Sequence, residues 1–300
     1  MRIAARIIVL VTLLLLIAAC TPASGDSEST SPSASAYIQN KGSDTIVNLG
    51  LAWAEEYQNV KPDVRISVTG GGSGTGLTAM ISGTVDIASA SRKIKDEEIA
   101  ASEANGISPV EYVIARDAIA VIVNPQNPVS ELSLDQIARI YRGEVENWSE
   151  LGGDDRPIVR LSRETNSGTH VYFLEEVVRL GDPENKEIFS PDTLLLPSSE
   201  GIISEVSENP NAIGYDGLGY VTDEVKVIAI ARTADQPYIL PSVETVNNGK
   251  YPISRDLYMY IQADASQNVL DYMTWILSAD AQTIVSDLGF VPILDSTAGK

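Results

Sequence analysis

Strand-like and helix-like segments alternate along this 300-residue chain, and this alternation constrains its fold more than any other feature. The apolar runs 64–69, 85–89, 110–115 and 119–123 have the length and composition of buried strands. Apolar residues at helical spacing lie between and after these runs: Ile46, Leu49, Trp53 and Tyr57, then Val269, Met273, Ile276, Ile284 and Leu288. The alternation predicts an α/β protein. Core packing accounts for the aromatic residues in these patterns, so none of them is assigned a ligand role.

The N-terminus has the pattern of a secretory signal. Two arginines precede an apolar run at 7–17, which is too short to span a bilayer comfortably. Two alanines then precede Cys20, the only cysteine, and this arrangement resembles the lipobox of bacterial lipoproteins. We therefore expect residues 1–19 to be a cleaved signal peptide and Cys20 to be the lipidated N-terminus. The alternatives are a buried thiol and an uncleaved signal anchor.

After this cysteine the chain consists almost entirely of Ser, Thr, Pro, Ala, Gly and acidic residues, so 20–36 is predicted to be a disordered tether. The remaining residues, 37–300, are enough for one large or two medium lobes. A single cysteine cannot form an internal disulfide, so the folded part must depend on its apolar core.

The chain is strongly acidic. Its net charge is −20, and it becomes −22 once the two arginines of the leader are removed. This charge repels nucleic acid and anionic lipid headgroups, which makes both poor partners. It also repels small anions at long range, so any anion site must act through short-range hydrogen bonds.

Two short segments are alike, and each is followed by an apolar run: Ala115-Arg116-Asp117 and Ser254-Arg255-Asp256. Hinged two-lobe proteins pass the chain between their lobes on paired strands, so these segments are candidate crossings. We accordingly expect lobe I to comprise 37–123 plus 257–300 and lobe II to comprise 124–256.

Three segments place glycine and hydroxyl residues just before a predicted helix: Gly42-Ser43-Asp44-Thr45, the glycine-rich run 70–76, and Asn166-Ser167-Gly168-Thr169. The start of a helix presents unpaired N–H groups, hydroxyls add further donors, and glycine allows a close approach, so the set favours an anion site. Ordinary helix capping is the alternative for each segment alone. The glycine run has neither the Lys-Ser/Thr ending of a P-loop nor the G-x-G-x-x-G spacing, which disfavours nucleotide binding.

These segments, taken with others, resemble the phosphate-binding protein of the high-affinity phosphate ABC importer, the PstS type. The others are Arg163, Val85-Asp86-Ile87, Asn124-Pro125 with Asn127-Pro128-Val129, Ile140-Tyr141-Arg142-Gly143, Asn147-Trp148-Ser149, Ala212-Ile213-Gly214-Tyr215 and Gly289-Phe290-Val291-Pro292. The resemblance covers nearly all of 37–300 in the family's order. It implies a two-lobe periplasmic-binding-protein fold of type II, with the ligand in the interlobe cleft and two crossover strands.

The resemblance also implies a function. The chain would bind inorganic phosphate with high affinity and deliver it to an ABC importer permease, while anchored by its lipid to the outer face of the bacterial cell membrane, on the periplasmic or extracellular side. It would be a monomer and not an enzyme, with no cofactor and no metal.

The phosphate ligands implied by the resemblance are Thr45, the backbone of Ile46, Ser73, Asp86, Arg163, Ser167, Gly168 and Thr169, with Ser43, Thr75, Ser91 and Arg92 as secondary candidates. Arg163 can offer a bidentate fork to two oxygens. Asp86 only accepts hydrogen bonds when ionised, so it needs a ligand that still carries an O–H, as phosphate does and sulfate at neutral pH does not. For Arg92 a salt bridge at the cleft rim is the alternative.

Three other functions remain open. The same fold could bind another oxyanion, such as sulfate or molybdate, a phosphonate or an organic phosphate. A phosphate-ester hydrolase is the alternative from another class, although the only histidine, His170, lies in a predicted helix start and no G-x-S-x-G element or Asp/His metal spacing is present in the sequence. A signalling or adhesion lipoprotein that has lost transport is the third.

Overall fold

The computed structural model describes residues 36–293 of the chain. The predicted signal peptide, Cys20 and the predicted tether lie outside the described residues, apart from Ala36, which begins the first strand. No helix within 36–293 is long and apolar enough to cross a membrane.

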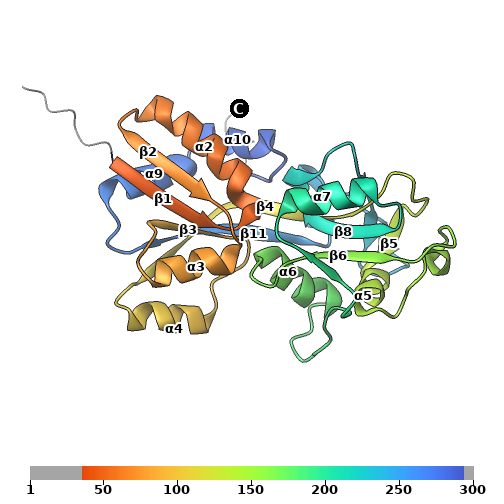
Figure 1. Ribbon diagram of the computed structural model, residues 1–300. Coiled ribbons are helices and arrows are strands. Elements are labelled where there is room, and N and C mark those ends of the chain that lie inside the picture. Colours follow the sequence, from red (N-terminus) through yellow and green to blue (C-terminus); the bar gives the residue numbers. More distant parts are fainter. Residues whose placement is uncertain (1–35, 294–300) are drawn as a thin grey trace, which may run out of the picture. The chain divides into compact units, whose positions relative to one another are not determined.

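Strands and helices alternate as the sequence predicts (Figure 1). The strands are β1 (Ala36–Gly42), β2 (Val64–Thr69), β3 (Ile87–Ala90), β4 (Pro109–Val123), β5 (Glu131–Ser133), β6 (Val159–Arg163), β7 (Leu194–Leu196), β8 (Ala212–Gly217), β9 (Lys226–Val227), β10 (Ala229–Ala231) and β11 (Ser254–Gln262). The α-helices are α2 (Val47–Val60), α3 (Ser73–Ile81), α4 (Asp96–Ala104), α5 (Leu134–Arg142), α6 (Gly168–Phe173), α7 (Ser199–Glu208), α8 (Val243–Asn247), α9 (Gln267–Ile276) and α10 (Ala279–Asp287). Short 3₁₀ turns span Asp44–Ile46 (η1), Trp148–Leu151 (η2) and Leu218–Tyr220 (η4), and a π-helical turn spans Leu174–Val178 (η3).

The main sheet of the described part has nine strands in the order β2-β1-β3-β11-β4-β8-β6-β7, with β9 also paired to β4. At one end β1 pairs in parallel with β2 and β3, and at the other β6 pairs in parallel with β7 and β8. Between these two groups β4 and β11 run antiparallel to each other. The sheet therefore has two parallel halves joined by one antiparallel pair.

The two strands predicted to cross between lobes form this central pair. Asp117 lies opposite Arg255 and Arg116 lies opposite Asp256 in the register of β4 and β11. The two apolar runs predicted around Arg116 and Asp117 are one continuous strand of 15 residues. Its first part pairs with β11 and its last part pairs with β8, so β4 belongs to both halves of the sheet.

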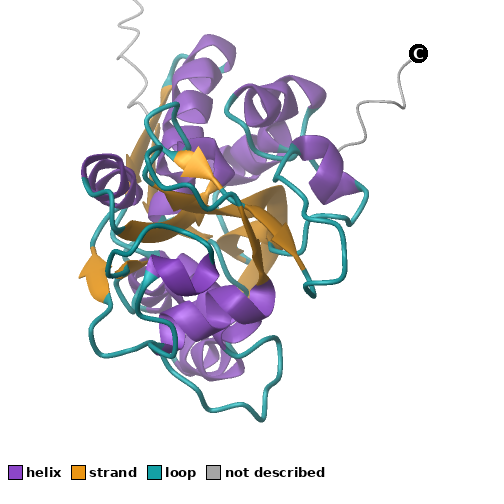
Figure 2. Ribbon diagram, turned by 90° about the vertical axis from the view of Figure 1, so that its right-hand side faces the viewer, coloured by secondary structure: helices purple, strands orange, loops and turns teal. Residues whose placement is uncertain are grey.

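Helices lie on both sides of the sheet in the end-on view of Figure 2, and Figure 1 shows which helices cover each half. In the first half, α2, α9 and α10 pack on one face around Trp53 and Tyr272, and α3 packs on the other through Leu77 and Met80. In the second half, α5 and α6 enclose an aromatic core, and α7 covers the opposite face. The helical spacing predicted from the sequence places its apolar residues in these cores.

The cores separate at the crossing strands. Ala115 packs in the core of the first half and Ala118 in that of the second, and at the start of β11 the same change falls between Ile253, just before the strand, and Leu257. The run 119–123 pairs with β8 and packs in the second half, so the expected lobe I limit at 123 is several residues too late. The halves are called lobe I and lobe II below, divided at these positions.

Prediction for Gly76. α3 lies so close to β1 that a Cβ at Gly76 would be 2.3 Å from the Lys41 carbonyl oxygen and 2.6 Å from Gly42 Cα. Helix propensity alone would make Gly76→Ala stabilising by about 1 kcal/mol. The backbone clash should reverse that sign, with a loss of about 1–3 kcal/mol in the free energy of unfolding measured in urea. Gly201→Ala in α7 is the matched control, because the nearest atom to its Cβ is Ser198 Oγ at 3.3 Å. Equal stability of the two variants would contradict the close approach.

Candidate functional site

A cluster of buried hydroxyls lies where the parallel strands of lobe I end. Ser43 Oγ, just after β1, donates to Ser91 Oγ at 2.9 Å, just after β3. Ser73, the first residue of α3, accepts from the Ser91 backbone N–H at 3.0 Å, and the two hydroxyls are 3.2 Å apart. The Ile46 N–H donates to the Ser43 carbonyl within the turn η1. The carboxyl ends of parallel strands are the usual place for a ligand in such sheets.

Lobe II brings its own segment against this cluster. Ser167 caps α6 by accepting from the Thr169 N–H at 3.2 Å, and Thr169 Oγ1 lies 3.0 Å from Thr45 Oγ1 of lobe I. A Cβ at Gly168 would be 2.4 Å from Ser73 Oγ and 2.5 Å from Ser91 Oγ. Glycine is therefore required at this contact between the lobes.

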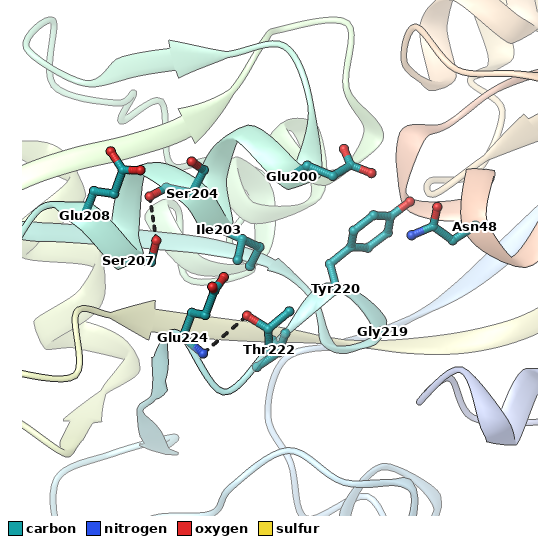
Figure 3. Close-up of a pocket in the computed structure, with 11 residues that line it drawn as sticks. Asn48, Glu200, Ile203, Ser204, Ser207, Glu208, Gly219, Tyr220, Thr222 and Glu224 are labelled. Atoms are coloured by element: carbon teal, nitrogen blue, oxygen red, sulfur yellow. Dashed lines mark hydrogen bonds between the residues drawn. The ribbon is translucent and has the colours of Figure 1, made fainter.

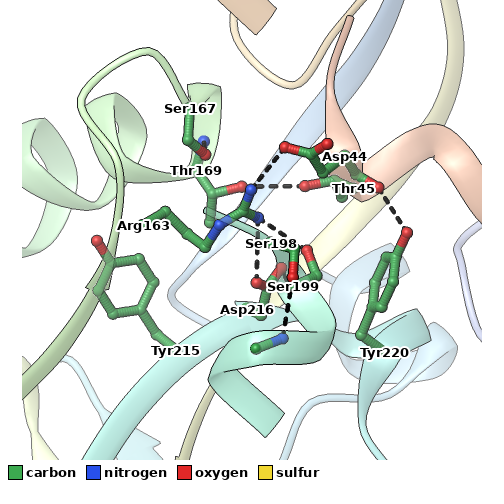
Figure 4. Close-up of polar contacts among 12 residues, drawn as sticks. Asp44, Thr45, Arg163, Ser167, Thr169, Ser198, Ser199, Tyr215, Asp216 and Tyr220 are labelled. Carbon is green, nitrogen blue, oxygen red and sulfur yellow. Dashed lines mark hydrogen bonds and ion pairs between the residues drawn. The ribbon is translucent and has the colours of Figure 1, made fainter. Parts of the chain in front are cut away.

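Arg163 lies at the end of β6 with 1% of its surface exposed, and Figure 4 shows the carboxylates and hydroxyls around it. Its Nη1 donates to Ser199 Oγ at 2.8 Å and to Asp216 Oδ2 at 3.4 Å. Its Nη2 donates to Asp44 Oδ2 at 2.6 Å and to the Pro197 carbonyl at 2.9 Å. Because Asp44 belongs to lobe I, this buried arginine links the two lobes.

A second buried arginine lies beside the threonine pair. Nη2 of Arg255 donates to Thr169 Oγ1 at 2.9 Å, to Asp117 Oδ2 at 3.2 Å and to Thr45 Oγ1 at 3.4 Å. Burial raises the pKa of Asp117 to about 6, although Arg255 opposes the rise. Burial likewise raises the pKa of Asp216, against the opposing effect of its arginine partner. The contact between the lobes is called the seam below. It combines two guanidinium groups, Arg163 and Arg255, with three carboxylates, Asp44, Asp117 and Asp216.

The expected ligand Asp86 is not brought to this cluster. It immediately precedes β3, and its Oδ2 accepts from the Gln39 N–H at 2.8 Å. Strand residues rise about 3.3 Å each, so Asp86 lies roughly 16 Å before Ser91, at the opposite end of the strand. This position corrects the expectation that Asp86 faces the ligand.

Two secondary candidates also have other partners. Arg92 forms a two-point salt bridge with Glu98, with N–O distances of 2.7 and 2.8 Å, which is the alternative noted from the sequence. The Thr75 hydroxyl donates to the Gly71 carbonyl within the first turn of α3. Neither side chain is held toward the threonine pair.

The histidine is a packed core residue. His170 Nδ1 lies 3.1 Å from Ser162 Oγ, and its ring centroid lies 4.7 Å from that of Phe189. Burial lowers the pKa of His170, which leaves it neutral at pH 7. Among the described residues, no group of three or more His, Cys, Asp or Glu side chains is placed to hold a metal ion.

A pocket of about 470 Å³ opens beside the site, between Asn48 of α2 and the segment from α7 to η4 (Figure 3). Glu200, Glu208 and Glu224 line it. Carboxylates repel an anion, so the pocket is a poor anion site despite its size. The hydroxyl cluster is the candidate site because its groups are donors.

Several residues at the seam were not selected as ligands from the sequence. Asp44 stood in one of the segments predicted to bind an anion, but it was passed over because a carboxylate repels anions. Asp117 and Arg255 stood in the segments noted only as crossings between the lobes. Ser199 follows the same pattern of hydroxyl and glycine at a helix start as the predicted segments. Asp216 has no local signal, because only the pairing of β6 with β8 brings it near Arg163.

Two α/β lobes joined by two crossover strands, with convergent donors at the seam, define a periplasmic-binding-protein fold of type II. A family model described as "PBP superfamily domain" matches residues 27–280. The phosphate-binding protein PstS of Pseudomonas aeruginosa is 34% identical over 281 residues, covering 88% of this chain and 85% of the relative. PstS of Bacillus subtilis is 31% identical over 292 residues, covering 94% and 91%.

A solved structure agrees with these relatives. The fold matches that of a Clostridium perfringens protein described as a phosphate ABC transporter substrate-binding protein with bound phosphate. The TM-score is 0.76 and the sequence identity is 33%, and the match covers 86% of this chain and all of the C. perfringens chain. The chain belongs to the PstS family of the PBP superfamily. This is a family of substrate-binding transport proteins and not of enzymes.

Prediction for Asp117. Because burial raises its pKa from 3.8 to about 6, the folded protein holds a proton that the unfolded chain releases. Stability is therefore lost as the pH rises through that window, by about 3 kcal/mol. The free energy of unfolding of the wild type, relative to Asp117→Asn, should fall between about pH 4 and pH 6 in urea titrations. A difference that is constant or rises over this range would contradict the raised pKa.

Proposed function

We propose that this chain binds inorganic phosphate between its two lobes and delivers it to an ABC importer. One observation carries the proposal: a buried arginine and the hydroxyls of Thr45, Ser73, Ser167 and Thr169 converge from both lobes on one seam. The family and the phosphate-bound relative support the choice of phosphate.

Arg163 has the geometry for a bidentate contact with two phosphate oxygens, and the surrounding hydroxyls and N–H groups suit the others. Thr45 and Ser73 belong to lobe I, whereas Arg163 and Thr169 belong to lobe II. An anion between them would satisfy both lobes at once, so closure would depend on the ligand.

The donors of the seam bond to other protein groups in this structure. Asp44 occupies one end of the Arg163 fork, and Thr45 bonds to Thr169. Phosphate would enter as the lobes separate about β4 and β11 and would replace these contacts with its own oxygens. The exchange offsets much of the desolvation of Arg163, since the guanidinium has a partner in both states.

Asp44 fits the selective role that the sequence suggested for Asp86. Its carboxylate lies on the arginine fork and also accepts from the Gly71 N–H at 2.8 Å. Ionised, it can accept the O–H of a phosphate that still carries a proton, while it repels a fully deprotonated oxyanion. We therefore propose that Asp44 discriminates phosphate from sulfate.

The proposal extends to the membrane anchor, the oligomeric state and the permease. Cys20 would carry the lipid that holds the protein on the outer face of the bacterial cell membrane, and the chain would act as a monomer. Closed protein would dock on the permease, with transport and ATP hydrolysis belonging to that partner. No cofactor is needed for reversible binding of an anion.

Prediction for Arg163. The purified wild type should bind phosphate tightly in calorimetry, and Arg163→Lys should weaken binding by about 10- to 100-fold, because lysine keeps the charge but loses the planar fork. Arg92→Lys is the matched control, since Arg92 is paired with Glu98, and it should retain the wild-type affinity. The proposed function fails if the wild type releases no heat with phosphate and binds another solute instead.

Prediction for Asp44. Asp44→Asn should admit sulfate, because an amide can donate to an oxygen that carries no proton. In calorimetry at pH 7.5, the ratio of phosphate affinity to sulfate affinity should be smaller for Asp44→Asn than for the wild type. Asp86→Asn should leave this ratio unchanged. Selectivity that depends on Asp86 and not on Asp44 would contradict the assignment.

A further inference from the structure

Arg255 is buried with much of its hydrogen-bonding capacity unused. Only 7% of the residue is exposed, and it lies on the crossover strand β11 opposite Asp117. Its Nη2 has three acceptors, but Nε and Nη1 have no hydrogen-bond partner among the described residues. A buried guanidinium with unpaired N–H groups is costly, so these donors point to an acceptor that is not part of the folded chain.

The surroundings of Arg255 hold its guanidinium in place. Its Cζ lies 5.4 Å from the centre of the Tyr172 ring, and the Tyr172 hydroxyl donates to the Ser254 carbonyl at 2.7 Å. Asp117 anchors it from β4. A planar cation held by an aromatic face and a carboxylate is preorganised for one direction of contact.

The threonine pair lies on the Nη2 side of the guanidinium, which carries the unpartnered Nη1 on the same carbon. The two acceptors of Nη2 besides Asp117 are the hydroxyls of Thr45 and Thr169, which Figure 4 shows facing each other across the seam. These hydroxyls come from different lobes and are among those proposed to hold phosphate. Arg255 therefore contacts the threonine pair from the crossover strand β11, while Arg163 contacts Asp44, the residue next to Thr45, from β6.

We propose that Arg255 is a second arginine of the anion site, donating to a phosphate oxygen held between Thr45 and Thr169, with Asp117 as its counter-ion. The inference rests on the proposed function. Arg163 already donates to two carboxylates, Asp44 and Asp216, whereas Arg255 has one, Asp117, and keeps two donor atoms without a partner among the described residues, so Arg255 has donors left for an anion. Because Arg255 and Asp117 lie on the two crossover strands, this contact would join the ligand to the connection between the lobes.

The test separates the loss of the Arg255 contact with phosphate from the loss of stability that follows when the buried ion pair is broken. Replacing Arg255 alone would leave Asp117 buried without its partner, so Arg255→Met is combined with Asp117→Asn and compared with Asp117→Asn alone. The control is Arg116→Met with Asp256→Asn, an arginine–aspartate pair one position further along the same strands, 3.7 Å apart and 42% exposed on each side. Thermal unfolding confirms that each variant is folded.

Calorimetry with inorganic phosphate gives the expected result. Asp117→Asn sets the reference affinity, because its amide oxygen can still accept from Arg255 while the buried negative charge is removed. The double variant at Arg255 and Asp117 binds about 10- to 100-fold more weakly than Asp117→Asn, and the control pair stays within about twofold of the wild type.

One result would overturn the inference while phosphate binding by the wild type stands. It is a double variant that binds phosphate as tightly as Asp117→Asn, whether or not both bind more weakly than the wild type, because the pair would then only shape the hinge. A wild type that binds no phosphate would instead overturn the proposed function, and the inference with it.

Discussion

The buried charge of Arg163 is the constraint on which the rest of the seam depends. A guanidinium with 1% exposure needs partners inside the protein, and those of its two Nη atoms come from both lobes: Asp44 from the start of lobe I, and Ser199 and Asp216 from lobe II. Removing one partner of a buried pair typically costs about 3–5 kcal/mol. The position of the lobes in this structure is therefore coupled to the state of one side chain.

The balance of charge at the seam explains how so acidic a protein could hold an anion. Three carboxylates face two guanidiniums, so the protein already supplies the negative partners that phosphate would replace. Binding then becomes an exchange of acceptors around fixed donors, and long-range attraction is not required. Such an arrangement favours a ligand that can both accept from arginine and donate to a carboxylate.

The fold could largely be read from the sequence because it depends on local periodicity. The strand at 64–69, the helix through Trp53 and Tyr57, and the paired segments around Asp117 and Arg255 all follow from short patterns. The single strand across 109–123 was not expected, since two polar residues interrupt its apolar runs. Burial on the crossing pair overrides that local signal.

The site was less predictable because it depends on which end of a strand faces the ligand. Asp86 and Ser91 are five residues apart in one motif, yet only Ser91 follows the carboxyl end of β3. Asp216 and Ser199 reach Arg163 only through sheet order and the placement of α7. Sequence spacing carries no information on such contacts.

Diffraction from crystals grown with arsenate, collected at the arsenic absorption edge, tests the central claim most directly, because the anomalous signal locates the anion itself. The account predicts one strong peak between Arg163 and Arg255, within hydrogen-bonding distance of Thr45 and Thr169. A peak elsewhere on the protein, with Thr45 still bonded to Thr169 and Asp44 still bonded to Arg163, would contradict it.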